Sequence, residues 1–291
     1  MEAVKHRRLS EILYGFYLLS HPIPVLFHTI AVAIFALVAS WPYFNWGVIA
    51  LVVVAHVAMQ LSIAILNDYC DRRLDTLGKK HKPIPLGLVR SHEALMLSLL
   101  MIVIMTLLLL PLNSLALLVS CLYLAFGQSY NLGLKSTPLS GVVFALAIPL
   151  IPLYAFVGVG HVLPVILWIV PVAALLGVAL NLANSLADIE EDAMNNAHTL
   201  AVVLGARGVY RACPLLIIFS ILLIGVLTFT HAVPAQTQLV LPTLTVTGLM
   251  VLGLLLFFRP TSVAKTGKRY FYIVVSLCIL LASGWLIGAL I

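Results

Sequence analysis

The hydrophobic positions of the chain fall into nine long runs separated by short polar stretches. The hydrocarbon layer of a bilayer is about 30 Å thick, so a helix rising about 1.5 Å per residue needs roughly 20 apolar residues to cross it. The runs lie at 20–41, 46–67, 93–111, 113–131, 139–158, 163–187, 209–230, 238–258 and 270–290. None shows the short alternating pattern of a barrel strand, so the pattern predicts an all-α bundle of nine transmembrane helices.

Charged residues are few, and their distribution orients the predicted bundle. Of the 291 residues, 63% are hydrophobic and 9% are charged, which is typical of a multi-pass membrane protein. With a cytoplasmic N-terminus, all sixteen Lys and Arg residues lie on the cytoplasmic side, and the opposite loops at 42–46, 111–113, 159–162 and 231–237 contain none. The positive-inside rule therefore predicts this orientation in a cell membrane. The +6 formal charge is dispersed over these loops, so we expect no nucleic-acid partner.

We expect a single transmembrane domain over residues 1–291, with polar segments at its cytoplasmic side. Residues 1–19 combine basic and apolar positions and are predicted to form an interfacial segment. Residues 68–92 and 188–208 are predicted to be cytoplasmic active-site loops. The basic run at 259–269 is interpreted as a topological anchor, and His28 and His161 receive no role. The four cysteines have no paired spacing, so we predict neither a zinc site nor a disulfide framework.

Seven of the ten acidic residues stand in two short windows of the chain. They are Asp68, Asp71 and Asp75 after the second run, and Asp188, Glu190, Glu191 and Asp192 after the sixth. Each window contains an amide and two carboxylates at four-residue intervals, which share one face of a helix: Asn67, Asp71 and Asp75, and Asn184, Asp188 and Asp192. Grouped carboxylates repel unless a cation intervenes, and oxygen ligands suit Mg²⁺. Two such windows on one side of the membrane predict a magnesium site for a diphosphate.

Polar positions continue from these windows into three of the runs. They are His56 and Gln60 in the second run, Gln128, Asn131 and Lys135 at the end of the fourth, and Asn181, Asn184 and Ser185 in the sixth. Polar side chains avoid lipid, so we expect the three spans to converge on one pocket at the cytoplasmic end. Candidates for the outer phosphate oxygens are Arg72, Lys79, Lys80, Lys82 and Lys135. Two alternatives stay open. The amides and His56 could form hydrogen bonds between helices instead of lining a pocket, and the acidic residues could belong to solvated loops.

The two windows resemble the two aspartate-rich motifs of the UbiA-type membrane prenyltransferase superfamily. The first, NDYCDRRLDTLGKKHKPIPLG at residues 67–87, is similar to the family's Asn-Asp start, its aspartates at four-residue intervals and its basic-Pro-x-Pro-x-Gly turn. The second, DIEEDAMNNAHTLAVVLG at residues 188–205, is similar to the family's paired aspartates and its downstream Thr-Leu-Ala-Val stretch. The resemblance covers essentially the whole chain.

The resemblance implies Mg²⁺-dependent transfer of an isoprenoid chain from an allylic polyprenyl diphosphate to an acceptor, surrounded by membrane lipid. The acceptor would be hydrophobic or amphipathic: an aromatic or quinone precursor, a chlorophyllide-like molecule or a lipid alcohol. The implied metal ligands are Asp68, Asp71, Asp75, Asp188 and Asp192, of which Asp71, Asp188 and Asp192 are also the implied catalytic residues. The implied substrate-binding residues are Asn67, Arg72, Lys82, Gln128, Tyr130, Asn131, Lys135, Asn184 and His198.

The second motif departs from the family pattern at two positions. Ala193 and His198 stand where basic residues are common in the family, so this motif offers fewer phosphate contacts. After the fourth run, four residues separate Tyr130 from Lys135, one more than is usual in the family. Terpenoid cyclisation and phosphoribosyl transfer to a polyprenyl phosphate stay open as related reactions. A cation-coupled transporter is the alternative from another class, although the predicted outer loops carry no charge that would line an access route.

Overall fold

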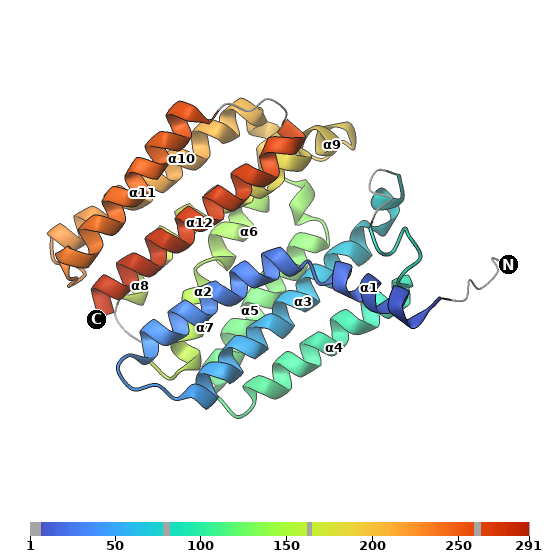
Figure 1. Cartoon of the computed structure of the whole chain (residues 1–291), viewed down its shortest axis with the longest axis horizontal. Helices are drawn as coiled ribbons and strands as arrows, with labels where there is room; N and C mark the ends of the chain where they lie inside the picture. Colours follow the sequence, from blue (N-terminus) through green and yellow to red (C-terminus); the bar gives the residue numbers. More distant parts are fainter. Residues whose placement is uncertain (1–6, 78–81, 162–164, 259–262, 291) are drawn as a thin grey trace.

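The structure is a computed structural model that describes residues 7–77, 82–161, 165–258 and 263–290 (Figure 1). All regular elements in the described residues are helices, which confirms the all-α multi-pass fold. Its elements are α1 (Leu9–Leu19), α2 (Pro22–Ser40), α3 (Trp46–Leu77), α4 (Ser91–Leu109), α5 (Ser114–Asn131), η1 (Leu134–Ser136), α6 (Ser140–Ala147), α7 (Leu150–Gly158), α8 (Ile166–Ser185), η2 (Leu186–Asp188), α9 (Ile189–Met194), α10 (Leu200–Phe229), α11 (Thr237–Phe257) and α12 (Val263–Leu290).

Eight helical segments in the described chain are long and apolar enough to cross a membrane. They are 22–40, 46–76, 91–109, 140–158, 166–194, 200–229, 237–257 and 266–290, and each contains or overlaps one of the predicted runs. The remaining run, 113–131, forms α5. Its last turn contains Gln128, Tyr130 and Asn131, and these polar residues lower its mean hydropathy, so α5 is not among the eight. The number of nine spans and the cytoplasmic N-terminus stay predictions.

The bundle brings distant segments of the chain together around α2, α3, α8 and α12. Helix α3 packs along α4, α8 packs between α6 and α10, and α12 contacts α2, α8 and η2. Figure 1 shows α10, α11 and α12 side by side at one edge of the bundle, with α3 and α4 at the other. The first half of the chain therefore faces the second half across the middle of the molecule.

Much of the two segments predicted to be active-site loops, 68–92 and 188–208, is helical in the described residues, and their role at the cytoplasmic side stays a prediction. Helix α3 continues past its apolar run to Leu77 and carries the whole first acidic window, because that stretch contains no Gly or Pro before residue 78. The second window is divided between α8, η2 and the short helix α9. Helix α10 already begins at Leu200 and changes direction at Gly205, whose φ of 67° is in the left-handed region that glycine adopts readily.

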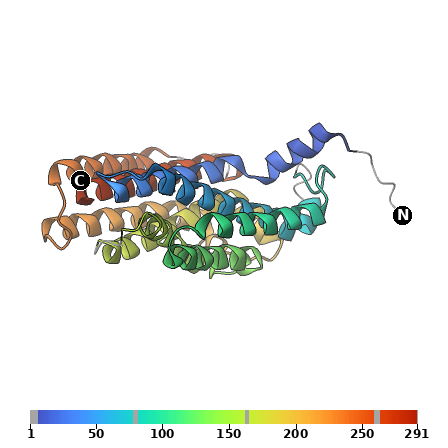
Figure 2. The same cartoon turned by 90° about the horizontal axis from the view of Figure 1, so that it is seen from below.

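Helix α1 is attached to the turn that leads from α3 into α4. The Arg7 guanidinium donates hydrogen bonds to the Glu93 carboxylate and to the Leu88 carbonyl oxygen, and the bond to Glu93 raises the pKa of Arg7. Gly15 lies so close to this turn that a Cβ there would stand 2.7 Å from the Val89 Cγ2 atom. Figure 2 shows α1 at the end of the molecule where the turn before α4 lies. The 82–90 turn is thereby held between α1 and α4.

Candidate active site

A cavity of about 740 Å³ opens at the end of the bundle where both acidic windows lie. Side chains from α2, α3, α5, η1, α6, α8, η2, α9 and α12 line it. The lining includes both predicted triplets, Asn67, Asp71 and Asp75 from α3, and Asn184, Asp188 and Asp192 from the α8 to α9 segment. Windows that lie more than 100 residues apart in the sequence thus face one cavity.

The first wall of the cavity is the face of α3 that carries Asn67, Asp71 and Asp75. These residues share that face, as their four-residue spacing predicts, because α3 is continuous through the window. Asp71 accepts a hydrogen bond from the ammonium group of Lys135, which follows α5 in the short helix η1. The Asn67 amide nitrogen donates to the Asn131 amide oxygen at 3.0 Å. The face of α3 that carries the window is thereby joined to the end of α5.

Asp68 stands apart from the other carboxylates of the first window. It is next to Asn67 in the helix, so its side chain points about 100° away from that face, and it does not line the cavity. Its Oδ1 atom accepts hydrogen bonds from His21 Nε2 at 2.9 Å and from Lys82 Nζ at 2.5 Å, and its side chain is 1% exposed. Asp68 is therefore hydrogen-bonded to two cavity-lining side chains, His21 and Lys82, and its predicted role as a metal ligand stays a prediction.

On the second wall, the carboxylates lie on three successive elements. Asn184 is at the end of α8, Asp188 ends η2, and Asp192 belongs to α9. The Tyr130 hydroxyl, from α5, lies within hydrogen-bond reach of Asn184 and Ser185. These three residues therefore do not share one face of a single helix. All three still line the cavity, because the chain changes direction between the three elements.

Three predicted substrate-binding residues are not brought to the cavity. Arg72 donates to the Tyr69 carbonyl oxygen and stacks over the Tyr69 ring, with its Cζ atom 4.1 Å from the ring centre. Gln128 donates to the Ser62 hydroxyl at 3.1 Å and thus links α5 to α3, as the helix-packing alternative predicts. His198 is exposed, and its backbone N–H donates to the Ser136 carbonyl oxygen. Lys79 and Lys80 lie outside the described residues.

The cavity also contains polar residues outside the predicted metal ligands and substrate-binding residues. His21, Glu191, Asn195, Asn196, Thr199 and Lys268 line it. Lys268 belongs to the run interpreted as a topological anchor. Gly267 lies against η2, where a Cβ would stand 2.7 Å from the Ala187 Cα atom, so α12 and the residue before Asp188 touch backbone to backbone. This close packing brings Lys268 to the second acidic window. Nothing in the spacing of residues along the sequence predicts that Lys268 lies there.

The oxygen donors of the cavity fit Mg²⁺. Within the described part of the chain, no three His, Cys, Asp or Glu side chains are grouped closely enough to hold a metal alone. Mg²⁺ is usually held by one or two carboxylates, with water and phosphate oxygens completing its octahedron. Asp71 and Asp75 on one wall, and Asp188 and Asp192 on the other, supply that number on each side. A diphosphate between the walls would provide the remaining oxygens.

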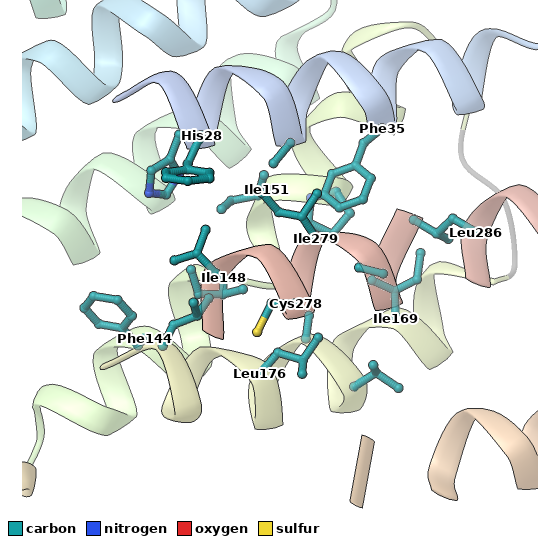
Figure 3. A pocket seen from close by; sticks show the side chains of 18 of the residues that line it. His28, Phe35, Phe144, Ile148, Ile151, Ile169, Leu176, Cys278, Ile279 and Leu286 are labelled. Carbon is teal, nitrogen blue, oxygen red and sulfur yellow. The ribbon is translucent and has the colours of Figure 1, made fainter. Parts of the chain in front are cut away.

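A second, apolar cavity of about 130 Å³ continues from the first. The two share the lining residues Pro24, His28, Phe144, Ile148 and Phe271. Figure 3 shows His28 and Phe144 at one end of this apolar cavity and Phe35, Ile169 and Leu286 at the other. The acidic cavity therefore leads into an apolar space between α2, α8 and α12.

Together, the fold and site define a helical membrane protein with an acidic cavity that opens into an apolar one. Residues 25–277 match the UbiA prenyltransferase family, so the chain belongs to this family. The 4-hydroxybenzoate octaprenyltransferase of Aliivibrio fischeri is 27% identical over 168 residues, which are 55% of this chain and 58% of that protein. The match thus spans just over half of that relative's length.

Two solved structures show that the fold is shared over most of the chain. A digeranylgeranylglyceryl phosphate synthase has a TM-score of 0.72 and 17% identity, covering 96% of this chain and 99% of that one. A UbiA homolog from Archaeoglobus fulgidus, bound to GPP and Mg²⁺, has a TM-score of 0.70 and 15% identity, covering 92% and 99%. At these identities the likeness establishes the fold, and the substrates of this chain are argued below from its own residues.

Proposed function

We propose that this protein transfers an isoprenoid chain from an allylic polyprenyl diphosphate to a hydrophobic or amphipathic acceptor in the membrane, with Mg²⁺ as cofactor. The observation that carries this proposal is the meeting of two carboxylate windows across one cavity that continues into an apolar one. Membership of the UbiA prenyltransferase family supports it. The Archaeoglobus fulgidus homolog bound to GPP and Mg²⁺ supports the donor class and the metal.

In this proposal, the residues of both walls hold the diphosphate end of the donor. Asn67, Asp71 and Asp75 take one Mg²⁺, and Asp188 and Asp192 take the second, with Asp71, Asp188 and Asp192 closest to the reaction. Bound Mg²⁺ would neutralise the diphosphate and stabilise it as a leaving group. Lys82, Lys135 and Lys268 line the same cavity and can bind the outer phosphate oxygens. Asp68 positions Lys82 and His21 through its two hydrogen bonds.

The reaction follows from this arrangement. The bond between the allylic carbon and the diphosphate oxygen breaks, and both electrons leave with the diphosphate. The apolar cavity receives the chain and keeps water from the allylic cation, which the acceptor's carbon or oxygen then attacks. The acceptor loses one proton, which the released diphosphate can take. The basic residues around the acidic cavity support a cytoplasmic location for its mouth, because that side of the membrane favours Lys and Arg.

The proposal is tested by transfer from a labelled allylic diphosphate to a panel of acceptors by purified protein, with products identified by mass spectrometry. We expect Asp188→Asn to lower transfer by more than roughly 100-fold, since even outer partners of metal ligands cost about 10- to 100-fold. Glu190→Gln is the matched control, because Glu190 is exposed and does not line the cavity. Full activity of Asp188→Asn, or products that are only cyclised or phosphoribosylated, would overturn the proposal.

A further inference from the structure

A polar wall lies at the inner end of the acidic cavity, away from the carboxylates. Gln60 of α3, Tyr123 of α5 and His28 of α2 line the cavity there. Gln60 is seven residues before Asn67, which is two helical turns, or about 10 Å, deeper along α3. His28 also lines the apolar cavity, and Figure 3 shows it at the same end of that cavity as Phe144, which lines both cavities as well. The wall is therefore beside the path that an isoprenoid chain would take.

Hydrogen bonds hold these side chains in one cluster. The Gln60 amide nitrogen donates to the Tyr123 hydroxyl at 2.8 Å and lies 3.2 Å from His28 Nδ1 and 3.2 Å from His56 Nε2. The His56 ring is fully buried behind Gln60 and packs between the Tyr123 and Tyr154 rings, with centroids 5.6 Å from each. Four helical segments thus fix the wall in place before any ligand binds.

The cluster has hydrogen-bonding capacity that its own members do not use. An amide nitrogen carries two hydrogens, whereas three polar atoms surround that of Gln60, namely the Tyr123 hydroxyl oxygen, His28 Nδ1 and His56 Nε2. Tyr123 accepts from Gln60, and within the described residues its own O–H hydrogen has no acceptor. His56 Nδ1 is buried with no hydrogen-bond partner among the described residues. A ligand that brings an oxygen to Tyr123 and Gln60 would complete this network.

The wall carries no cation. Within the described residues, the Lys side chains that line the cavity are Lys82, Lys135 and Lys268, which stand with the carboxylate windows, and no Arg lines it. Beside the polar wall the lining is apolar and includes Ile63, Phe144 and Ile148. A carboxylate placed there would lose its hydration without gaining a counter-ion, which is strongly unfavourable. An uncharged hydroxyl or carbonyl group would lose much less hydration free energy there, and it could form hydrogen bonds with the polar wall.

We propose that Gln60, Tyr123 and His28 form the acceptor subsite and that they select an acceptor whose bound group is an uncharged hydroxyl or carbonyl. This inference rests on the proposed function and narrows its acceptor class. It separates this chain from its relative named for 4-hydroxybenzoate, since that acceptor carries a carboxylate. The donor's diphosphate occupies the acidic mouth, its chain enters the apolar cavity, and the acceptor lies against α3 and α5, where the allylic carbon would meet it.

The decisive experiment compares two acceptors that differ in one charge, 4-hydroxybenzoate and methyl 4-hydroxybenzoate. We expect purified protein to transfer from labelled GPP to the ester with kcat/KM at least about 10-fold above that of the acid, because the acid's carboxylate has no counter-ion at the wall. Equal efficiency, or preference for the acid, would overturn the inference.

A preference for the ester could also arise because the ester partitions into lipid more readily than the acid, and variants of the wall distinguish this explanation from a polar subsite. Tyr123→Phe and Gln60→Met should raise KM for the ester and reduce the ester-to-acid ratio, without changing KM for the donor. Ser120→Ala is the matched control, because it also removes a buried hydroxyl from α5 but one that does not line the cavity. A ratio unchanged in Tyr123→Phe and Gln60→Met contradicts the subsite.

A binding measurement keeps this inference distinct from the proposed function. In the presence of Mg²⁺ and inorganic pyrophosphate, the ester should raise the melting temperature of the wild-type protein more than that of Gln60→Met. If neither acceptor is prenylated but this difference is found, the proposed function fails and the subsite stands. If transfer proceeds but the difference is absent, the subsite fails alone.

Discussion

At the residue scale, neighbouring aspartates of one motif do different work because a helix turns by about 100° per residue. Asp71 and Asp75 share the cavity face of α3, whereas Asp68 is directed at His21 and Lys82. All three were predicted metal ligands from their common motif. In the proposed function Asp71 and Asp75 are ligands and Asp68 is a positioning residue, and only the placement of α3 relative to α2 and the 82–90 turn separates these two roles.

The first prediction concerns Asp68→Asn. Losing the charge that holds Lys82 and His21 should raise KM for the diphosphate donor by about 10-fold, in line with the loss of a buried ion-pair contact. The Mg²⁺ concentration that gives half-maximal rate should stay the same. Steady-state kinetics at varied donor and varied Mg²⁺ measure both, and a raised Mg²⁺ requirement would instead identify Asp68 as a ligand. Asp71→Asn serves as the comparison, since its Mg²⁺ requirement should rise.

At the element scale, close helix contacts decide which residues reach the site. Gly267 permits the approach of α12 to η2, and Gly177 permits the approach of α8 to α6, where a Cβ would stand 2.5 Å from the Phe144 carbonyl oxygen. These contacts bring α12 against the second acidic window and α6 against the apolar cavity. Lys268, from another helix, thus lines the cavity beside the second motif, which has Ala193 and His198 where basic residues are common in the family.

The second prediction tests Lys268. Removing its charge in Lys268→Gln should raise KM for the donor and weaken inhibition by inorganic pyrophosphate by about 10-fold, whereas Lys268→Arg should retain most of the affinity. Arg269→Gln is the matched control, because its exposed side chain is next in sequence and does not line the cavity. An equal effect of both Gln substitutions would show that general surface charge, rather than contact, is responsible.

The third prediction tests the contact between α6 and α8. Gly177→Ala should lower the melting temperature through a cost of about 1 to 3 kcal/mol, because backbone atoms of Phe144 cannot move aside as a flexible side chain can. Gly248→Ala in α11 meets nothing within 4 Å and should leave stability the same or slightly raise it. Thermal unfolding in one detergent compares the two, and equal shifts would argue against a close α6–α8 contact.

At the scale of the whole molecule, the bundle is built by apolar packing and the polar cavity is placed at one end of it. The core contains large, almost fully buried side chains from both halves of the chain, such as Met59, Phe156 and Trp285. The carboxylates of the two acidic windows contribute little to this core, since Asp71, Asp75, Asp188, Glu191 and Asp192 line the cavity. Fold and cofactor binding should therefore be separable.

The fourth prediction follows from that separation. Chelation of divalent metal should abolish prenyl transfer while leaving the helical circular dichroism spectrum unchanged, and added Mg²⁺ should restore the rate. The physical reason is that Mg²⁺ would contact the cavity walls and phosphate oxygens, not the apolar contacts that hold the helices together. Loss of helical signal on chelation would show that metal is part of the fold.

Local spacing by itself predicted the helices, the two acidic windows and their meeting at one end of the bundle. Those features follow from lengths of apolar runs and from the four-residue period, which act within one segment. Tertiary structure alone decided that Asp68 faces away, that Gln128 joins helices, that Lys268 joins the second window, and that Gln60, Tyr123 and His28 form one wall. These outcomes depend on which helices become neighbours and how closely they pack, and no single segment of the chain encodes that.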